Sequence, residues 1–264
     1  VFSHHDAGSV HQFLGVGIDI TERKQAEQQS LALLLEQERV EVLAGFVRDA
    51  GHSFRTPLST INTSLYLLQH QTEPERRARH IDIIQRQVSY LDRLVEAMVQ
   101  MLQLDRGRPL SLVETDLNMM LRNACVNLGQ FIQDKQQHLV LDLGELPLHP
   151  IDQYEMNRAI NAIIENAVRY TPPQGTITIQ SRVEDDIRIA IADTGIGIDE
   201  HDLPHVFDHF FRGGSAQDAG GLGMGLAIAQ KIIHRHAGTI EVESTLGTGS
   251  RFTIRLPLNA VETG

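Results

Sequence analysis

The sequence contains a single cysteine, Cys125, and no tryptophan, and aromatic side chains make up only 5% of its 264 residues. One cysteine excludes an internal disulfide and favours a reducing compartment, so we expect a cytoplasmic chain. No apolar run approaches the roughly 20 residues that a membrane helix needs. Basic residues are few, 23 against 34 acidic ones, and the net charge of −11 argues against nucleic acid as a partner, since nucleic-acid binders neutralise phosphates with basic surfaces.

The remaining composition is that of an ordinary soluble protein. Apolar residues make up 41% and charged residues 22%, which excludes disordered and collagen-like chains. The length predicts one or two domains with connecting helix. Because the sequence lacks an initiator methionine and a signal peptide, we expect it to be part of a longer protein. Residues 1–20 alternate apolar and polar side chains around a Gly8-Ser9 turn and predict a β-hairpin.

A long helical segment follows from Thr21 to about Gln69. Its apolar residues recur every seven positions, at Ala26, Leu33, Val40, Val47, Phe54, Ile61 and Leu68. Such a repeat predicts a helix packed along its length against other helices. Pro57 lies within the repeat and is expected to kink the helix.

A turn at residues 71–74 leads to a second predicted helix. Its apolar residues alternate steps of three and four, at Ile81, Ile84, Val88, Leu91, Val95, Met98 and Leu102. These seven residues form an apolar seam. A hairpin of two helices covers such a seam poorly, whereas two hairpins form a four-helix bundle. The pattern therefore predicts a homodimer through residues 21–105.

The helical pattern ends at Arg106-Gly107-Arg108-Pro109, which predicts a domain boundary. Beyond it, predicted helices and strands mix without strict alternation, which favours an α+β two-layer sandwich over a doubly wound sheet. The expected helices are 116–134, 152–169 and 225–236, and the expected strands are 138–143, 175–182, 186–192, 238–244 and 250–257.

Two glycine-containing segments in this region have the chemistry of a nucleotide site. Asp193 closes a predicted buried strand and is followed by Gly195 and Gly197, so its carboxylate would be a fixed acceptor for the exocyclic amine of adenine. Residues 220–226 place four glycines before a helix, where backbone N–H groups suit phosphate oxygens. A plain strand-to-loop turn and a flexible surface lid are the alternatives without a ligand.

Polar residues on two predicted helices complete the set of candidates. The amide of Asn166 could offer an oxygen to Mg²⁺ shared with phosphates, and Arg169, three residues on, could hold a phosphate. His52 comes five residues after the core position Val47 and therefore faces outward, as an imidazole available to attack a phosphoryl group. Thr56 lies one turn later on the same side. A lone asparagine or histidine is more commonly an ordinary helix or surface residue than a functional one.

Together these motifs resemble those of sensor histidine kinases of bacterial two-component signalling, in the order found in that family. His52 to Leu58 resembles the phosphoacceptor box, and Asn166 to Tyr170 resembles the Asn box. Asp19 to Lys24 is similar to the exit of a PAS sensor domain. The remaining boxes are matched by Asp193 to Gly197, by Phe207 to Arg212, by Gly221 to Leu226 and by Gly247 to Gly249.

The resemblance implies a domain order and a set of roles. It implies a PAS-like remnant (1–20), a dimerisation and phosphotransfer domain (21–105), a linker (106–111), a Bergerat-type ATP-binding domain (112–258) and a tail (259–264). In it His52 accepts the γ-phosphoryl group of ATP, Asn166 holds Mg²⁺, and a receiver domain of a response regulator docks near His52. Thr56 matches the position that orients water during phosphatase action. The implied ATP-binding residues are Asn166, Arg169, Tyr170, Asp193, Gly195, Gly197, Phe207, Arg212, Gly221, Gly223, Met224, Gly225, Leu226 and Thr248.

Two positions depart from the family pattern. Ser53 replaces the usual acidic residue after the phosphoacceptor histidine and is a poor general base, and Ala162 replaces an asparagine four residues before Asn166. These changes favour a second hypothesis, a kinase-impaired or phosphatase-biased scaffold that still binds nucleotide. Another Bergerat-fold ATPase, such as a chaperone or topoisomerase, is disfavoured by the histidine-bearing hairpin. Three histidines spaced by four, His201, His205 and His209, are expected to share a solvated helix face rather than bind zinc.

Overall fold

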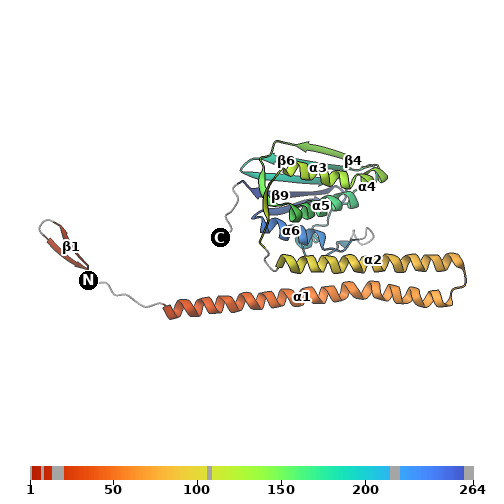
Figure 1. The fold of residues 1–264 in the computed structure, drawn as a ribbon, viewed down its shortest axis with the longest axis horizontal. Helices are drawn as coiled ribbons and strands as arrows, with labels where there is room; N and C mark the ends of the chain where they lie inside the picture. Colours follow the sequence, from red (N-terminus) through yellow and green to blue (C-terminus); the bar gives the residue numbers. More distant parts are fainter. Residues whose placement is uncertain (1, 7–8, 14–20, 106–108, 215–220, 259–264) are drawn as a thin grey trace. The chain divides into compact units, whose positions relative to one another are not determined.

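The computed structural model describes residues 2–6, 9–13, 21–105, 109–214 and 221–258 (Figure 1). The chain divides into two compact units, residues 1–48 and residues 49–264. In the first unit, β1 (Phe2–Asp6) pairs antiparallel with β2 (Ser9–Phe13). The expected hairpin is therefore present, whereas the apolar residues expected after Phe13 lie outside the described residues. Helix α1 (Thr21–His70) begins in this unit and continues into the second.

The expected helical hairpin forms from α1 and α2 (Pro74–Asp105). α1 is continuous through Pro57, which is buried. The predicted turn occupies residues 71–73, and proline begins α2, where its missing N–H costs no helical hydrogen bond. The guanidinium of Arg77 donates to the carbonyl oxygens of Leu68 at 2.9 Å and Gln71 at 3.1 Å. These bonds join the start of α2 to the end of α1.

The apolar seam predicted on the second helix, here called the α2 seam, stays largely uncovered within one chain. Ile81, Val88, Val95 and Leu102 are 46%, 45%, 48% and 41% exposed. A different stripe on the same helix is buried, at Leu94, Ala97, Met101 and Leu104. α2 also contacts α6 (Gly225–Arg235), and Arg158 donates to the Gln100 side chain at 2.6 Å. Sequence periodicity found the seam but not this second stripe.

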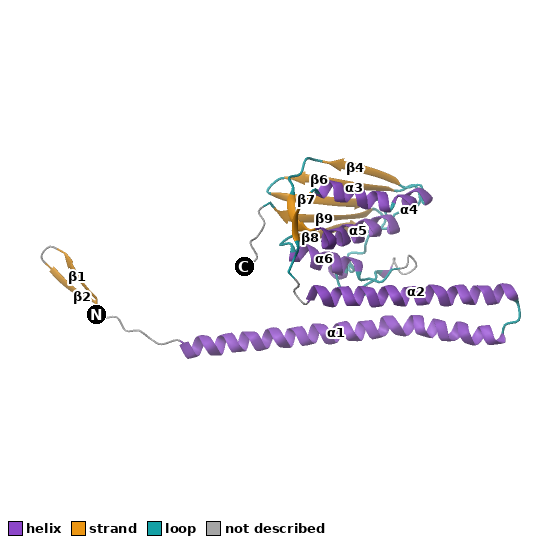
Figure 2. Ribbon diagram, viewed as in Figure 1, coloured by secondary structure: helices purple, strands orange, loops and turns teal. Residues whose placement is uncertain are grey.

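The rest of the second unit is a five-stranded sheet with helices on one face (Figure 2). The strand order is β4-β6-β7-β9-β8, and only β4 and β6 pair in parallel. The bounds are β4 (His138–Leu143), β6 (Thr176–Val183), β7 (Asp186–Asp193), β8 (Thr239–Thr245) and β9 (Gly249–Pro257). The covering helices are α3 (Leu117–Asn127), α4 (Gly129–Asp134), α5 (Gln153–Tyr170) and α6. The predicted α+β two-layer architecture is confirmed.

Alternating isoleucines form the core between the two layers. The strand residues Ile177, Ile179, Ile187, Ile189, Ile191 and Ile254 are fully buried, as are Ile160, Ile163 and Ile164 of α5 and Ile232 and Ile233 of α6. Because side chains alternate along a strand, one face of the sheet is apolar and carries the helices. Arg235 of α6 pairs with Glu155 of α5, which ties the two central helices together.

Three sequence expectations were wrong. Residues 116–134 form two helices instead of one, because the chain leaves helical geometry at Leu128, which ends α3 and precedes α4. The short pair β3 (Leu112–Thr115) and β5 (His149–Asp152) was not predicted, since strands of four residues carry little periodicity. His201, His205 and His209 share no helix face, because this segment has only a 3₁₀ turn at Leu203–His205. The described residues contain no cluster of three or more potential metal-binding side chains.

Side chains from a neighbouring loop hold the C-terminal end of α5. Lys135 Nζ donates to the carbonyl oxygens of Val168 at 2.9 Å and Arg169 at 2.7 Å, and Gln137 Nε2 donates to that of Thr171 at 2.7 Å. These groups satisfy carbonyls that have no partner inside the helix and complement its negative end. The last turn of α5 is therefore held in a defined position.

Within the part of the chain that the structure describes, no helix has the length and apolarity required to cross a membrane.

Candidate functional site

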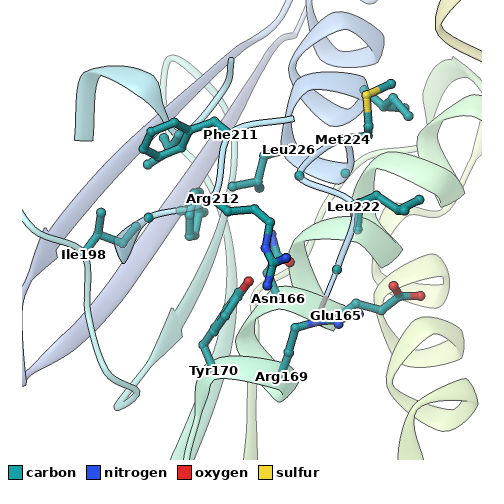
Figure 3. A pocket seen from close by; sticks show the side chains of 18 of the residues that line it. Glu165, Asn166, Arg169, Tyr170, Ile198, Phe211, Arg212, Leu222, Met224 and Leu226 are labelled. Carbon is teal, nitrogen blue, oxygen red and sulfur yellow. The ribbon is translucent and has the colours of Figure 1, made fainter. Parts of the chain in front are cut away.

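A cavity of about 300 Å³ lies beside α5 and the start of α6 (Figure 3). Its walls come from α5, the end of β7, the loop at residues 206–213 and the glycine-rich segment 221–226, with Ser250 and Phe252 of β9 and Arg93 and Ala97 of α2 completing the lining. The structure brings together ten of the predicted ATP-binding residues in this lining: Asn166, Arg169, Tyr170, Asp193, Arg212, Gly221, Gly223, Met224, Gly225 and Leu226.

Asp193 is placed by the end of β7, where the alternation of buried residues directs it to the helix-covered side. Its Oδ1 accepts a hydrogen bond from the N–H of Gly195 at 2.8 Å. Burial raises the pKa of this carboxyl above its ordinary value, and hydrogen bonds from the backbone of Gly195 and Ser250 oppose that shift. The carboxylate is thus held in one direction at the cavity wall. It can accept a hydrogen bond from a ligand amine.

Four predicted site residues shape the cavity but do not line it. A Cβ on Gly195 would lie 2.6 Å from Asp193 Oδ1, and Gly197 has a φ of +66° and packs against the backbone of Thr245. Phe207 packs edge-on against Phe252, with ring centroids 6.5 Å apart. Thr248 is exposed in the turn between β8 and β9. These four residues therefore lie outside the lining of the cavity in this structure.

The inner face of α5 brings polar side chains to the cavity. In Figure 3, the side chains of Arg212 and Tyr170 point into the space beside Asn166. A Cβ at Gly221 would lie 3.4 Å from Arg169 Nη1, so Arg169 lies directly beside the glycine-rich segment. Two guanidinium groups next to backbone N–H groups make this end of the cavity suitable for phosphate oxygens.

The surroundings of Asn166 fit a magnesium ligand. Among the described residues, no hydrogen bond engages its side-chain amide, so its oxygen is available to a hard cation. Glu165, also in the lining, is exposed. Ala162 lines the cavity as well and meets Gly225, where an added Cβ would lie 3.6 Å from its methyl group. The neighbouring Asn161 is not in the lining, so it does not replace an amide at position 162.

Several lining residues were missed by sequence reasoning. They are Arg93 and Ala97 of α2 together with Ala162, Glu165, Ile198, Val206, Phe211, Gly213, Leu222, Ile228, Ser250 and Phe252. Ser250 and Phe252 are two residues apart on β9 and therefore lie on the same face of that strand. Phe211 lies within the segment that resembles the Phe box. No sequence signal indicates that α2 contributes to this cavity, because that depends on which residues of distant segments meet.

His52 lies on α1 and is exposed, as predicted, although Val47, the residue taken as the core position for that prediction, is itself 61% exposed in a single chain. Its Nδ1 is 3.5 Å from Arg55 Nη1, one turn further along the helix. Ser53 is half-buried and Thr56 is exposed. None of His52, Ser53 and Thr56 lines the cavity, so the structure does not bring these three residues to the pocket.

Two known protein families match this chain, one in the helical hairpin and one in the region that forms the cavity. Residues 151–260 match the family described as Histidine kinase-, DNA gyrase B-, and HSP90-like ATPase, which includes every cavity residue except Arg93 and Ala97. Residues 42–107 match the His Kinase A (phospho-acceptor) domain, which includes His52. The chain therefore contains a region that matches the phospho-acceptor domain, followed by a region that matches the ATPase family.

Individual relatives are similar to the chain across both regions. The chain is 30% identical over 233 residues to the sensor protein RprX of Bacteroides fragilis, covering 84% of this chain and 45% of RprX. It is 29% identical over 260 residues to the sensor histidine kinase WalK of Bacillus subtilis, covering 95% of this chain and 40% of WalK. The chain thus spans less than half the length of these curated relatives.

A solved structure shares the fold. The histidine kinase ThkA, in complex with the response regulator protein TrrA, superposes with a TM-score of 0.71 at 23% identity. The match covers 92% of this chain and 69% of that one.

Proposed function

We propose that this protein transfers the γ-phosphoryl group of ATP to His52 and then to an aspartate of a response-regulator receiver domain. The observation that carries the proposal is an exposed imidazole in the region that matches the phospho-acceptor domain, on the same chain as a cavity in the region that matches the ATPase family. The similarity of this chain to WalK, named a sensor histidine kinase, and to RprX, named a sensor protein, supports the proposal.

The lining residues form two chemical groups, one suited to the adenine of ATP and the other to its phosphates. The Asp193 carboxylate accepts the adenine amine, and the apolar side chains of Ile198 and Phe252 suit the faces of the base. Arg169 and Arg212 hold phosphate oxygens together with backbone N–H groups of the glycine-rich segment. The segment from about Arg212 to Gly223 forms a lid in this proposal, and residues 215–220 of it lie outside the described residues.

Asn166 is the proposed magnesium ligand, through its amide oxygen. A bound Mg²⁺ neutralises charge on the transferring phosphates. The chain's own contribution is to orient the triphosphate, so that the γ-phosphorus is presented for in-line attack by His52 Nε2. The phosphoryl group then passes to the receiver, and Thr56, exposed one turn from His52, would orient water when the reaction runs as a phosphatase.

We further propose that the α2 seam forms a homodimer through residues 21–105. The seam exposes four large apolar side chains in a single chain, and a second hairpin would bury them. Wild-type protein is expected to show twice the mass of one chain in light scattering. Val88→Glu should yield the monomer, whereas Met119→Glu, at an exposed apolar residue of α3, should leave the dimer intact. A monomeric wild type at micromolar concentration would contradict the proposal.

The domain order expected from the sequence remains part of the proposal. In it, residues 1–20 end a PAS-like sensor domain and residues 106–111 link the helical hairpin to the ATP-binding domain. The β1–β2 pair is compatible with the final hairpin of such a domain.

Radiolabelled ATP tests the proposed activity directly. Label in the γ-phosphate should enter the protein as an acid-labile, base-stable product, because phosphohistidine hydrolyses in acid, and label in the α-phosphate should not enter. A receiver domain added later should remove the label. Nucleotide binding without any incorporation would instead support the alternative, a kinase-impaired or phosphatase-biased scaffold, which Ser53 favours.

Ser53→Glu separates these alternatives by placing a carboxylate next to His52. A positioned general base typically contributes about 10²–10⁴-fold, which is the upper bound for the gain. We expect a faster single-turnover autophosphorylation with little change in the affinity for ATP, because position 53 is not in the cavity. Ser53→Gln is the control of equal size without the base. A rate equal to or below that of the wild type would show that Ser53 is no handicap.

A further inference from the structure

The proposed reaction leaves one proton without an obvious acceptor. When neutral imidazole attacks through Nε2, the proton must be on Nδ1, and bond formation leaves the ring positively charged until that proton departs. The hydroxyl of Ser53 does not act as a base near pH 7. The protein therefore needs another group beside Nδ1 of His52.

The helix supplies one carboxylate at the required place. Asp49 is the sole acidic residue between Glu41 and Glu73. It precedes His52 by three positions, so the two share a face of α1, with Cβ atoms about 5–6 Å apart. Side chains on a helix lean toward its N-terminus, which inclines the imidazole toward the turn that carries Asp49. Both side chains are exposed, and Asp49 also lies near enough to His209 for its charge to oppose the lowering of that ring's pKa by burial.

The opposite neighbour of His52 is a cation. Arg55 Nη1 lies 3.5 Å from Nδ1, a long hydrogen bond, and a guanidinium can only donate. In this contact Nδ1 is the acceptor, so the proton of the neutral ring sits on Nε2. That tautomer has no lone pair at the atom that must attack phosphorus. The observed contact is therefore a resting arrangement.

We propose that Asp49 and Arg55 compete for Nδ1 of His52, and that Asp49 is the proton acceptor of the phosphoryl transfer. With Asp49 bound, Nδ1 carries the proton and Nε2 has its lone pair. Nε2 forms a bond to the γ-phosphorus, the bond from that phosphorus to the bridging oxygen breaks with its electron pair leaving on ADP, and the Nδ1 proton passes to the carboxylate. Arg55 remains beside the ring to attract the phosphate charge. This inference rests on the proposed function.

Kinetics of Asp49→Asn test the catalytic part, because asparagine keeps the size and loses the base. We expect single-turnover autophosphorylation to fall by about 10²-fold with an unchanged KM for ATP. Asp82→Asn, at an exposed carboxylate of α2 paired with Arg86, should have no effect. Ser53→Glu should restore the rate of Asp49→Asn and raise it by a larger factor there than in the wild type. A rate within twofold of the wild type, or a rescue that is absent although the fold is intact by circular dichroism, would overturn the proposal.

The tautomer of His52 provides a readout that does not depend on activity. Heteronuclear NMR of its ring nitrogens should show Asp49→Asn shifted toward the Nε2–H form and Arg55→Gln shifted toward the Nδ1–H form. Unchanged tautomer populations in both variants would refute the competition. If wild-type protein bound ATP without forming phosphohistidine, the proposed function would fail, whereas these NMR shifts would still decide whether Asp49 engages His52.

Discussion

Replacement of His52 by alanine is expected to abolish the acid-labile label from ATP while leaving nucleotide binding unchanged. The imidazole is the proposed nucleophile, so its removal leaves no atom to form the bond to phosphorus. ATP affinity should persist because His52 lies on α1 and is absent from the cavity lining. Incorporation is measured by autoradiography, and affinity by calorimetry with a non-hydrolysable analogue.

His70→Ala is the matched control for this variant. His70 is another exposed histidine of α1, and its ring contacts the carbonyl oxygen of Tyr66 at 2.8 Å. Its loss should leave the label at the wild-type level. Acid-labile label that survives His52→Ala would assign the acceptor to another of the 13 histidines.

Asp193→Asn is expected to weaken ATP binding by about 10- to 100-fold, since a hydrogen bond to a charged group contributes about 1.5–3 kcal/mol. The change replaces the carboxylate acceptor by an amide whose NH₂ group faces two backbone donors and the adenine amine. Asp142→Asn is the control, because that carboxylate is exposed and pairs with Arg182 away from the cavity. An affinity equal to that of the wild type would exclude Asp193 as the group that reads adenine.

The raised pKa of Asp193 predicts how the affinity for ATP depends on pH in the wild type, and this dependence should be absent from the variant. Burial disfavours the charged form, so the carboxyl gains its proton at a higher pH than an ordinary aspartate does. Wild-type affinity for ATP should therefore fall as the pH drops through that raised value, and Asp193→Asn should lose this step.

By linkage, the raised pKa makes the folded state bind protons more readily than the unfolded one, so ionisation of Asp193 lowers stability as pH rises. In Asp193→Asn without ligand, the free energy of unfolding should lack the fall with rising pH that ionisation of Asp193 causes in the wild type.

The helical hairpin shows how far periodicity alone can reach. Steps of three and four defined the α2 seam, and steps of seven placed His52 on the outward face of α1, because both patterns are local consequences of helix geometry. The buried stripe of Leu94, Ala97, Met101 and Leu104 was not predicted from the sequence. A helix with two apolar faces has no single period that reports both.

The ATP-binding region shows the complementary limit. Asp193, Asn166 and the glycine-rich segment were found because each has a residue type that its chemistry requires. Gly195, Gly197, Phe207 and Thr248 were also predicted as ATP-binding residues, and they lie outside the cavity lining. A motif indicates that a residue matters to a site but does not distinguish contact from support, since both constrain the residue type.

The sequence by itself determined the elements and most of the chemistry: an outward histidine on a long helix, an uncovered apolar seam, and a sheet whose buried strand ends in an aspartate. These follow from interactions between near neighbours along the chain. Only the tertiary structure decided which side chains meet: Ser250 and Phe252 with Asp193 at one end of the cavity, Arg169 beside Gly221 at the other, and α2 against α6. Such contacts join residues far apart in sequence, and they depend on strand order and on how helices pack on the sheet, which no local pattern records.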